Sequence, residues 1–237
     1  MPAHPPKAEK HDTMVYIIIL AMVLLFGPHL WAKQVLNRYN RHEYFSGSGV
    51  ELARLIIARL NLQGVSVELT NTGDHYDPAA KTIRLTQGIC GRKTLTAVVV
   101  AAHEVGHAIQ DLSGYKPLKT RTRMIGTAQK LERFGAIIMM AVPVLAGVTR
   151  APSVGILMLA GGFATLCIPV LVHLLTLPTE FDASFNRALP MLTAGRYIPA
   201  EDVSKARKIL FACALTYVAN SLIGLLNVWR WIQVLRR

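Results

Sequence analysis

Four long apolar runs dominate the sequence and limit the folds that are open to it. They span residues 14–30, 134–148, 154–177 and 209–226. Hydrophobic residues make up 52% of the chain and charged residues 17%, which is an apolar balance for a water-soluble domain. A helix of about 20 apolar residues is long enough to cross a bilayer. We therefore expect a mainly α-helical multi-pass membrane protein with about four spans and a small α+β domain.

The positions of the basic residues suggest an orientation for such a protein. The net charge is +12, and most lysines and arginines lie in residues 33–133 and 178–208. Four spans would place these two segments on one side, and the positive-inside rule assigns that side to the cytoplasm. The basic clusters lie near the ends of the apolar runs without interleaved aromatic residues, so membrane lipid is the expected partner and nucleic acid is not.

Residues 33–133 carry the patterns of a small α+β domain. Residues 48–60 have apolar residues at helical spacing, whereas residues 65–69 and 82–86 alternate between apolar and polar. The segment between these two expected strands is rich in turn-forming residues. We therefore predict a helix followed by a β-hairpin with a long loop, just ahead of a second helix over residues 94–112.

That second helix contains the motif His103-Glu104-Val105-Gly106-His107. Residues four apart lie on one face of a helix, so His103 and His107 can bind one cation with Glu104 beside them. This pattern is the signature of zinc peptidases, in which the glutamate is a general base. Histidines that only form hydrogen bonds are the alternative, but burying two imidazoles and a carboxyl group without partners is costly. The three cysteines form no CxxC pair, which argues against a cysteine zinc site.

A catalytic zinc ion usually has three protein ligands, so one more is needed. Glu180 is the best candidate, because two intervening spans would return it to the side of His103. On a helix Glu180, Ser184 and Arg187 share one face, which could point toward the metal. The other candidates for the third ligand are Asp182, Glu132, Glu201 and His173.

Further residues are candidates for supporting roles. Asp111 lies four residues after His107, where it could accept the ring N–H of a ligating histidine, and Ser184 is a second candidate for contact with the ligands. The oxyanion of peptide hydrolysis needs a donor besides the metal. Arg187 is the first candidate for that donor, followed by His75 and Tyr76. The alternative for Asp111 and Arg187 is a solvated surface charge.

Three segments of the chain resemble the YugP-like neutral zinc metallopeptidases, a family of bacterial membrane proteins. They are residues 74–78 (DHYDP), 100–110 (VAAHEVGHAIQ) and 177–184 (LPTEFDAS). The resemblance implies a gluzincin arrangement, with His103, His107 and Glu180 as zinc ligands and Glu104 as the base. More distantly similar membrane proteases carry an acid four residues after the ligand glutamate, where this chain has Ser184.

These observations predict a zincin-like metallopeptidase domain within a membrane protein of the bacterial inner membrane, with its catalytic domain facing the cytoplasm. The expected segments are a flexible N-terminal tail (1–13), a transmembrane anchor (14–32), the domain with the HExxH helix (33–133), a transmembrane hairpin (134–177), the third-ligand segment (178–208) and a C-terminal transmembrane helix (209–237). The first run is expected to be retained, because residues 27–33 lack a signal-peptide cleavage pattern.

The expected function is zinc-dependent endopeptidase activity on membrane-associated or unfolded proteins. Residues 82–86 could pair with an extended substrate as an added strand, unless their hairpin is purely structural. Zn²⁺ is the expected cofactor, protein or peptide substrate and membrane lipid are the expected partners, and a homo-oligomer is compatible with the sequence. The alternative function is a catalytically silent membrane scaffold that keeps a structural or regulatory zinc site.

Overall fold

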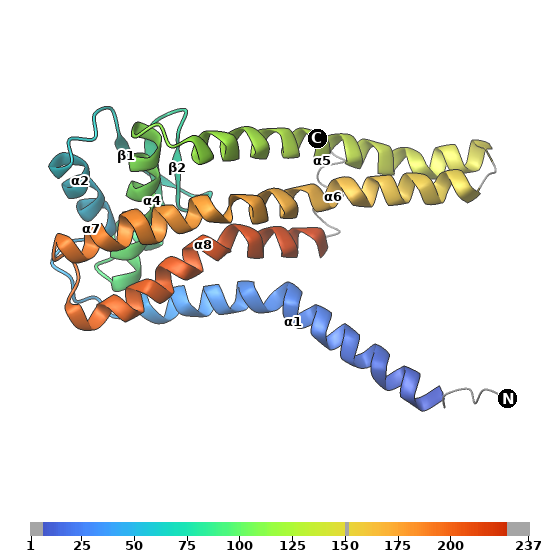
Figure 1. Cartoon of the computed structure of the whole chain (residues 1–237), viewed down its shortest axis with the longest axis horizontal. Helices are drawn as coiled ribbons and strands as arrows, with labels where there is room; N and C mark the ends of the chain where they lie inside the picture. Colours follow the sequence, from blue (N-terminus) through green and yellow to red (C-terminus); the bar gives the residue numbers. More distant parts are fainter. Residues whose placement is uncertain (1–6, 150–151, 227–237) are drawn as a thin grey trace.

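Helices account for most of the computed structural model, which describes residues 7–149 and 152–226. One end of the molecule holds the sheet and the short helices, and the long helices extend away from it (Figure 1). The elements in chain order are α1 (Lys7–Tyr39), α2 (Gly49–Arg59), β1 (Ser66–Thr70), β2 (His75–Asp77), β3 (Thr82–Thr86), α3 (Gln87–Cys90), α4 (Leu95–Leu112), α5 (Lys116–Thr149), α6 (Pro152–Phe181), the π-helix η1 (Asp182–Ala188), α7 (Leu189–Ala194), the 3₁₀-helix η2 (Ala200–Asp202) and α8 (Val203–Leu226).

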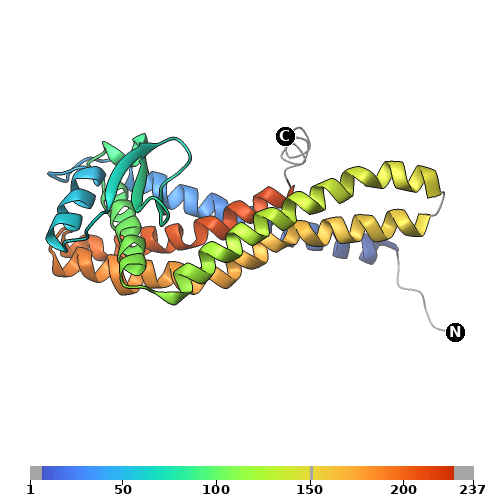
Figure 2. The same ribbon diagram turned by 90° about the horizontal axis from the view of Figure 1, so that it is seen from above.

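The long helices pack in two pairs. Helices α5 and α6 form an antiparallel hairpin that projects beyond the rest of the molecule, and α1 lies along α8 (Figures 1 and 2). Helix α8 also packs against α6, which joins the two pairs. Helix α1 contains Pro28 and bends along its length, as expected where proline removes a backbone hydrogen bond.

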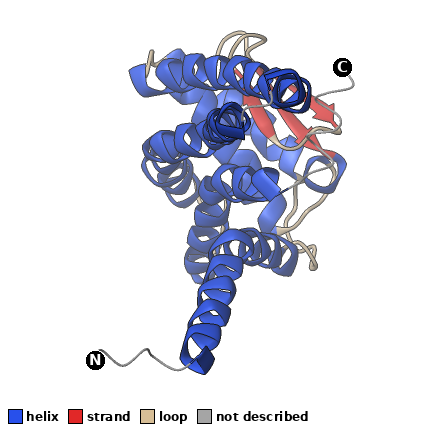
Figure 3. Cartoon of the chain, turned by 90° about the vertical axis from the view of Figure 1, so that its right-hand side faces the viewer, coloured by secondary structure: helices blue, strands red, loops and turns tan. Residues whose placement is uncertain are grey.

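The sheet has three strands in the order β1-β3-β2 and lies at one side of the helices (Figure 3). Strand β3 pairs in parallel with β1 and antiparallel with β2. The predicted hairpin is therefore wrong, because the connection between the two predicted strands itself forms a strand, β2. Strand β3 is the central strand with a partner on both sides, so it has no free edge for a substrate strand, contrary to the sequence-based proposal for residues 82–86.

Helix α4 lies at the centre of the compact end. It is buried along almost its whole length, against α2, the π-helix η1 and α8, with β2 and β3 nearby. The first half of α4, residues 95–102, is almost entirely apolar, which is typical of a helix at the centre of a core. The core around α4 includes Ile56 from α2, Leu85 from β3, Leu192 from α7 and Leu210 from α8. This packing places the HExxH residues inside the protein.

The start of helix α2 lies very close to the backbone of α3 and of the first turn of α4. It begins with a capping box, in which the Ser48 hydroxyl accepts from the Glu51 amide and the Glu51 carboxylate accepts from the Ser48 amide. A Cβ atom on Gly49 would lie only 2.5 Å from the carbonyl oxygen of Ile89 and 2.9 Å from that of Ala97. Both obstacles are backbone atoms, so the close approach depends on glycine.

Replacing Gly49 with alanine is therefore expected to lower the free energy of unfolding. The added methyl group must push α2 away from α3 and α4, and overpacking of this kind costs about 1–3 kcal/mol. Urea unfolding followed by circular dichroism would measure the loss. Gly88→Ala is the matched control, because a Cβ at Gly88 meets nothing within 4 Å. Equal stability of the two variants would contradict the proposed clash.

The prediction of a multi-pass membrane protein with four spans is wrong for the part of the chain that the structure describes. Within residues 7–149 and 152–226, no helix is both long and apolar enough to cross a membrane. Helix α8 shows how an apolar run can mislead: its residues Ile209, Leu210, Ala212 and Ala214 are buried within the protein. The predicted cytoplasmic orientation depended on the spans, so the structure gives it no support.

The ends of the chain also differ from prediction. Helix α1 begins at Lys7, so residues 7–13 are helical rather than a flexible tail, and residues 1–6 lie outside the described residues. The predicted transmembrane hairpin over 134–177 corresponds to the outer half of α5 and most of α6, which form a helical hairpin; within the described residues, neither helix is long and apolar enough to cross a membrane. Of the turn between them, residues 150–151 are not described. The predicted extension of the last helix over 227–237 also lies outside the described residues.

Candidate metal centre

Helix α4 presents two histidines on one buried face. The helix is capped by Thr94, whose hydroxyl accepts a hydrogen bond of 3.1 Å from the Ala97 amide. One turn apart, His103 and His107 are each 2% exposed, and their ring centroids lie 4.8 Å apart. The spacing therefore produces the pair of facing imidazoles that the sequence predicts.

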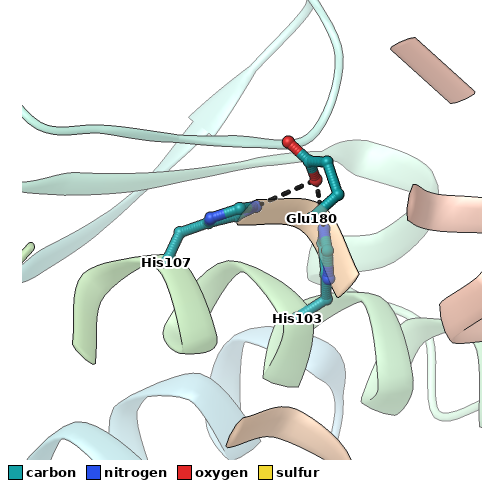
Figure 4. Close-up of side chains that lie close together, drawn as sticks. All are labelled: His103, His107 and Glu180. Atoms are coloured by element: carbon teal, nitrogen blue, oxygen red, sulfur yellow. Dashed lines mark hydrogen bonds and ion pairs between the residues drawn. The ribbon is translucent and has the colours of Figure 1, made fainter. Parts of the chain in front are cut away.

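Glu180 brings a carboxylate to the same point from the end of α6. Its Oε2 atom lies 3.4 Å from Nε2 of His103 and 3.2 Å from Nε2 of His107 (Figure 4). One donor atom from each of the three residues lies within 4.8 Å of the others. Among the described residues, this is the one group of three or more histidine, cysteine or acidic side chains with that spacing.

The other candidates for the third ligand do not join this group. Asp182 accepts hydrogen bonds from Gln110 and Arg187, and Glu201 is exposed on the wall of another cavity. His173 lies on α6 but is not among the grouped donors. The side chain of Glu132 lies outside what the structure describes.

Gly106 allows the two parts of the centre to meet. A Cβ atom at Gly106 would lie 2.6 Å from the carbonyl oxygen of Ala183, which belongs to the π-helix η1. That distance is shorter than any ordinary contact, so α4 and η1 can pack this closely only because residue 106 has no side chain. The contact holds the segment that carries Glu180 against the helix that carries the histidines.

Hydrogen bonds fix the orientation of both imidazoles. Nδ1 of His107 lies 2.9 Å from Oε1 of Gln110, and Nδ1 of His103 lies 3.1 Å from the Ser184 hydroxyl. The amide oxygen of Gln110 can only accept, and the Ser184 hydroxyl donates to the Leu210 carbonyl. Both Nδ1 atoms must therefore carry a proton, so Nε2, which faces Glu180, is the nitrogen that each ring can offer to a metal. This is how a protein orients histidine ligands for a metal.

Gln110 is a functional residue that the sequence reasoning missed. It is fully buried, and its amide nitrogen also donates to the Thr179 carbonyl and to Asp182. It therefore ties His107 to the segments on both sides of Glu180. A signal was available, because Gln110 lies three residues after His107 and hence on the same face of the helix.

Replacing Gln110 with methionine is expected to weaken zinc binding by about 10–100-fold, because partners of metal-bound histidines typically contribute that much. The substitution keeps the length of the side chain but leaves His107 Nδ1–H without an acceptor. Competition with a fluorescent zinc chelator would measure the affinity. Gln129→Met, at an exposed position of α5, is the control. Equal zinc affinity in both variants would show that Gln110 does not orient His107.

Glu104 lies beside the histidines with one oxygen unpaired. The side chain is buried, and its Oε2 atom has no hydrogen-bond partner among the described residues. Burial is the main reason that the pKa of Glu104 is raised to about 7. Burial acts on Glu180 in the same direction, but His107 and Arg121 hold the pKa of Glu180 well below its ordinary value. One carboxyl group is thus held as a carboxylate, and the other can exchange a proton near neutral pH.

A cavity of about 520 Å³ opens onto His103 and Glu104. Its wall includes the loop before β2 and β2 itself, together with parts of α1, α4, α5 and α8. The volume is in the range of ordinary ligand pockets. Glu104 can therefore meet a bound molecule, even though it is almost inaccessible to solvent in this structure.

The structure gives other roles to two of the predicted supporting residues, Asp111 and Arg187. Asp111 accepts a hydrogen bond of 3.0 Å from the Tyr76 hydroxyl and not from a histidine, which corrects the prediction for Asp111. Tyr76 and His75 both line the cavity, and His75 Nδ1 donates to the Gly73 carbonyl. Arg187 does not line the cavity. It pairs with Asp182 at 2.8 Å and lies over the ring of Tyr115, so the structure does not place it at the oxyanion.

The chemistry of the donors fits a zinc ion. Two imidazole nitrogens and one carboxylate oxygen form the ligand set of several catalytic zinc sites, and the contacts at Nδ1 leave Nε2 of both imidazoles as the nitrogen available to a metal. Glu104 lines the same cavity as His103, and its Oε2 atom has no hydrogen-bond partner among the described residues.

The buried group of two histidines and one carboxylate is compatible with a zinc site, and comparison with known proteins points to the same class of protein. The chain belongs to the family described as "Putative neutral zinc metallopeptidase", whose model matches residues 14–236. It is 30% identical to the "Putative membrane protease YugP" of Bacillus subtilis (strain 168) over 223 residues, which is 93% of this chain and 95% of the relative. These matches confirm the family predicted from the sequence. No solved structure gives a significant match.

Proposed function

We propose that this protein is a zinc-dependent endopeptidase of the gluzincin type. His103, His107 and Glu180 would hold the metal, and Glu104 would act as the general base. Membership of a zinc peptidase family supports the reaction class. The observation that carries the residue assignment is the convergence of three donor atoms within 4.8 Å, beside a carboxyl group with an unpaired oxygen.

The residues of the site have distinct parts in this reaction. Zinc held there would supply a Lewis acid and make water acidic enough to lose a proton near neutral pH. Glu104 takes that proton as water attacks the peptide carbonyl, and then passes it to the leaving amine. Gln110 and Ser184 keep the two histidines aligned.

The proposed substrates are unfolded or membrane-associated proteins, met at the surface of a membrane. Support comes from the name of the relative, a membrane protease, and from the large apolar side chains exposed on two outer parts of the molecule. The outer part of α1 exposes Tyr16, Leu20 and Leu24, and the α5–α6 hairpin exposes Phe134 and Val148. Apolar surfaces of this kind mark sites of contact with proteins or lipid.

The proposal can be tested with purified protein. Zinc content measured by atomic emission, together with cleavage of an unfolded fluorescent casein, would be compared between wild type and Glu180→Ala. We expect about one zinc per chain and metal-dependent cleavage in the wild type, as a site with three protein ligands requires. Glu180→Ala is expected to lose both. Glu201→Ala is the control, because Glu201 is exposed and far from the donors. Zinc retained in Glu180→Ala would refute the ligand set.

A further inference from the structure

Arg121 is a largely but not fully buried cation in contact with the proposed third ligand. It comes from the first part of α5, and its Nη2 atom lies 2.8 Å from Oε1 of Glu180. The side chain of Arg121 is 12% exposed and that of Glu180 is 2% exposed. Oε1 accepts no well-directed hydrogen bond within the described residues, so the contact acts chiefly through charge. Nothing in the sequence pattern singled out Arg121 among the basic residues of its segment.

The two oxygens of Glu180 face different partners. Oε2 faces Nε2 of both His103 and His107, and Figure 4 shows the other oxygen pointing away from the imidazoles. Arg121 lies on that outer side. The ion pair and the approach to the histidines therefore do not compete for the same atom, and both can persist when a metal lies between Oε2 and the two rings.

A carboxylate can bind a metal through one oxygen or through both. A zinc site that activates water needs three protein ligand atoms and one open position. If Glu180 turned to offer both oxygens, the second oxygen would crowd that position and raise the coordination number from four to five. We propose that Arg121 is a positioning residue: its guanidinium group holds Oε1 of Glu180 away from the metal, so that Oε2 alone is a ligand and one position stays open for water.

The position of Arg121 suits this role. Arg121, Thr122 and Ile125 form the part of α5 that lines the cavity, while Glu180 ends the other leg of the same hairpin. The ion pair thus joins the two legs at the point where the metal centre meets the cavity. A buried carboxylate that loses its cation keeps its desolvation cost without compensation, so Glu180 would turn toward another partner. The nearest positive charge would then be the metal itself.

The inference rests on the proposed function, because it takes His103, His107 and Glu180 as zinc ligands. Zinc affinity by chelator competition would be measured for wild type, Arg121→Gln and Arg121→Met, two variants that remove the charge but keep much of the length. We expect both to bind zinc about 10–100-fold more weakly, as is typical when a partner of a metal ligand is lost. Arg121→Lys keeps the charge and is expected to recover part of the affinity. Arg123→Ala, at an exposed position of the same helix, is the control.

Replacing zinc with cobalt(II) gives a readout that a purely structural role would not change. The visible absorption of cobalt(II) weakens when its coordination number rises from four to five. We expect weaker bands in Arg121→Gln and Arg121→Met than in wild type and Arg123→Ala, because Oε1 of Glu180 would join the metal. The Met variant decides the question if the Gln variant does not fold.

The outcomes separate the two proposals. A wild-type protein that binds no zinc would refute the proposed function itself. Zinc binding by wild type, with equal affinity and an equal cobalt spectrum in the variants without the charge, would refute only the role of Arg121. Weaker zinc binding with an unchanged cobalt spectrum would also refute it, since Arg121 would then stabilise the site without setting how Glu180 binds.

Discussion

Replacing Glu104 with glutamine is expected to lower kcat/KM for protein cleavage by about 10²- to 10⁴-fold, the usual contribution of a general acid–base group. Glutamine has nearly the same shape as glutamate but cannot take a proton from water. Its side chain is not one of the three grouped donors, so zinc is expected to stay bound. The loss should therefore appear in the chemical step rather than in the metal content.

The same substitution separates the peptidase from the scaffold hypothesis. Zinc content, the far-ultraviolet circular dichroism spectrum and casein cleavage would be measured for wild type and Glu104→Gln. Glu51→Gln is a matched control, because Glu51 is an exposed glutamate on another helix. If Glu104→Gln cleaved as fast as wild type, the assignment of the base would be refuted. Full zinc content without cleavage by the wild type would favour a scaffold.

The environment of Glu104 explains why glutamine should fold there. The carboxyl group is buried with one oxygen unpaired, and its pKa is raised to about 7 because burial disfavours the charged form. A neutral amide has no such charge to desolvate. A stable but inactive Glu104→Gln protein is therefore the expected result, and its stability makes the loss of activity interpretable.

Local spacing made part of the site predictable from the sequence. The HExxH pattern required only that residues 94–112 form a helix, and α4 covers Leu95–Leu112. Glu180 was harder to predict as a ligand, because it lies 73 residues after His107 in the sequence. It was proposed from a shared membrane side that the structure does not support, and from a family resemblance that the comparisons confirm. The approach of Glu180 to the histidines depends on the hairpin of α5 and α6, which returns the chain to α4.

The supporting contacts could not be predicted in the same way. A histidine partner can come from any segment that packs nearby, so Asp111 and Gln110 were equally plausible neighbours of His107. The structure decides between them, because Asp111 is taken by the Tyr76 hydroxyl. Arg121 became visible only once α5 was seen to lie against the end of α6. Such roles depend on how helices pack, which residue spacing does not encode.

The predicted fold was wrong where apolar runs were interpreted as membrane spans. Hydropathy measures how apolar a segment is, but not which surface covers it. In the first part of the run in α8, Ala212 and Ala214 are fully buried by other parts of the chain. The sheet was misread for a related reason: alternation identified β1 and β3, but the three residues of β2 were too few to give a pattern. Because β2 was not predicted, the strand order β1-β3-β2 could not be predicted either.

Replacing Gly106 with alanine is expected to weaken zinc binding by more than about 100-fold and to abolish cleavage. The new methyl group would lie 2.6 Å from the Ala183 carbonyl oxygen, so α4 and η1 must separate by several tenths of an ångström. Zinc–ligand distances tolerate only about 0.2 Å. Because Ala183 follows Glu180 closely and Gly106 lies between the two histidines, this separation acts directly on the three donors. Overpacking is also expected to lower the free energy of unfolding by about 1–3 kcal/mol.

Zinc titration and thermal unfolding of Gly106→Ala would test this, with Gly126→Ala as the control. Gly126 is also helical, but a Cβ there meets nothing within 4 Å, so the control should bind zinc as the wild type does. The comparison also separates geometry from stability. A Gly106→Ala protein that is only less stable, yet binds zinc normally, would mean that η1 can shift without carrying Glu180 along. Loss of zinc from a protein that still unfolds cooperatively would show that the contact between Gly106 and Ala183 sets the distance between the histidines and the carboxylate.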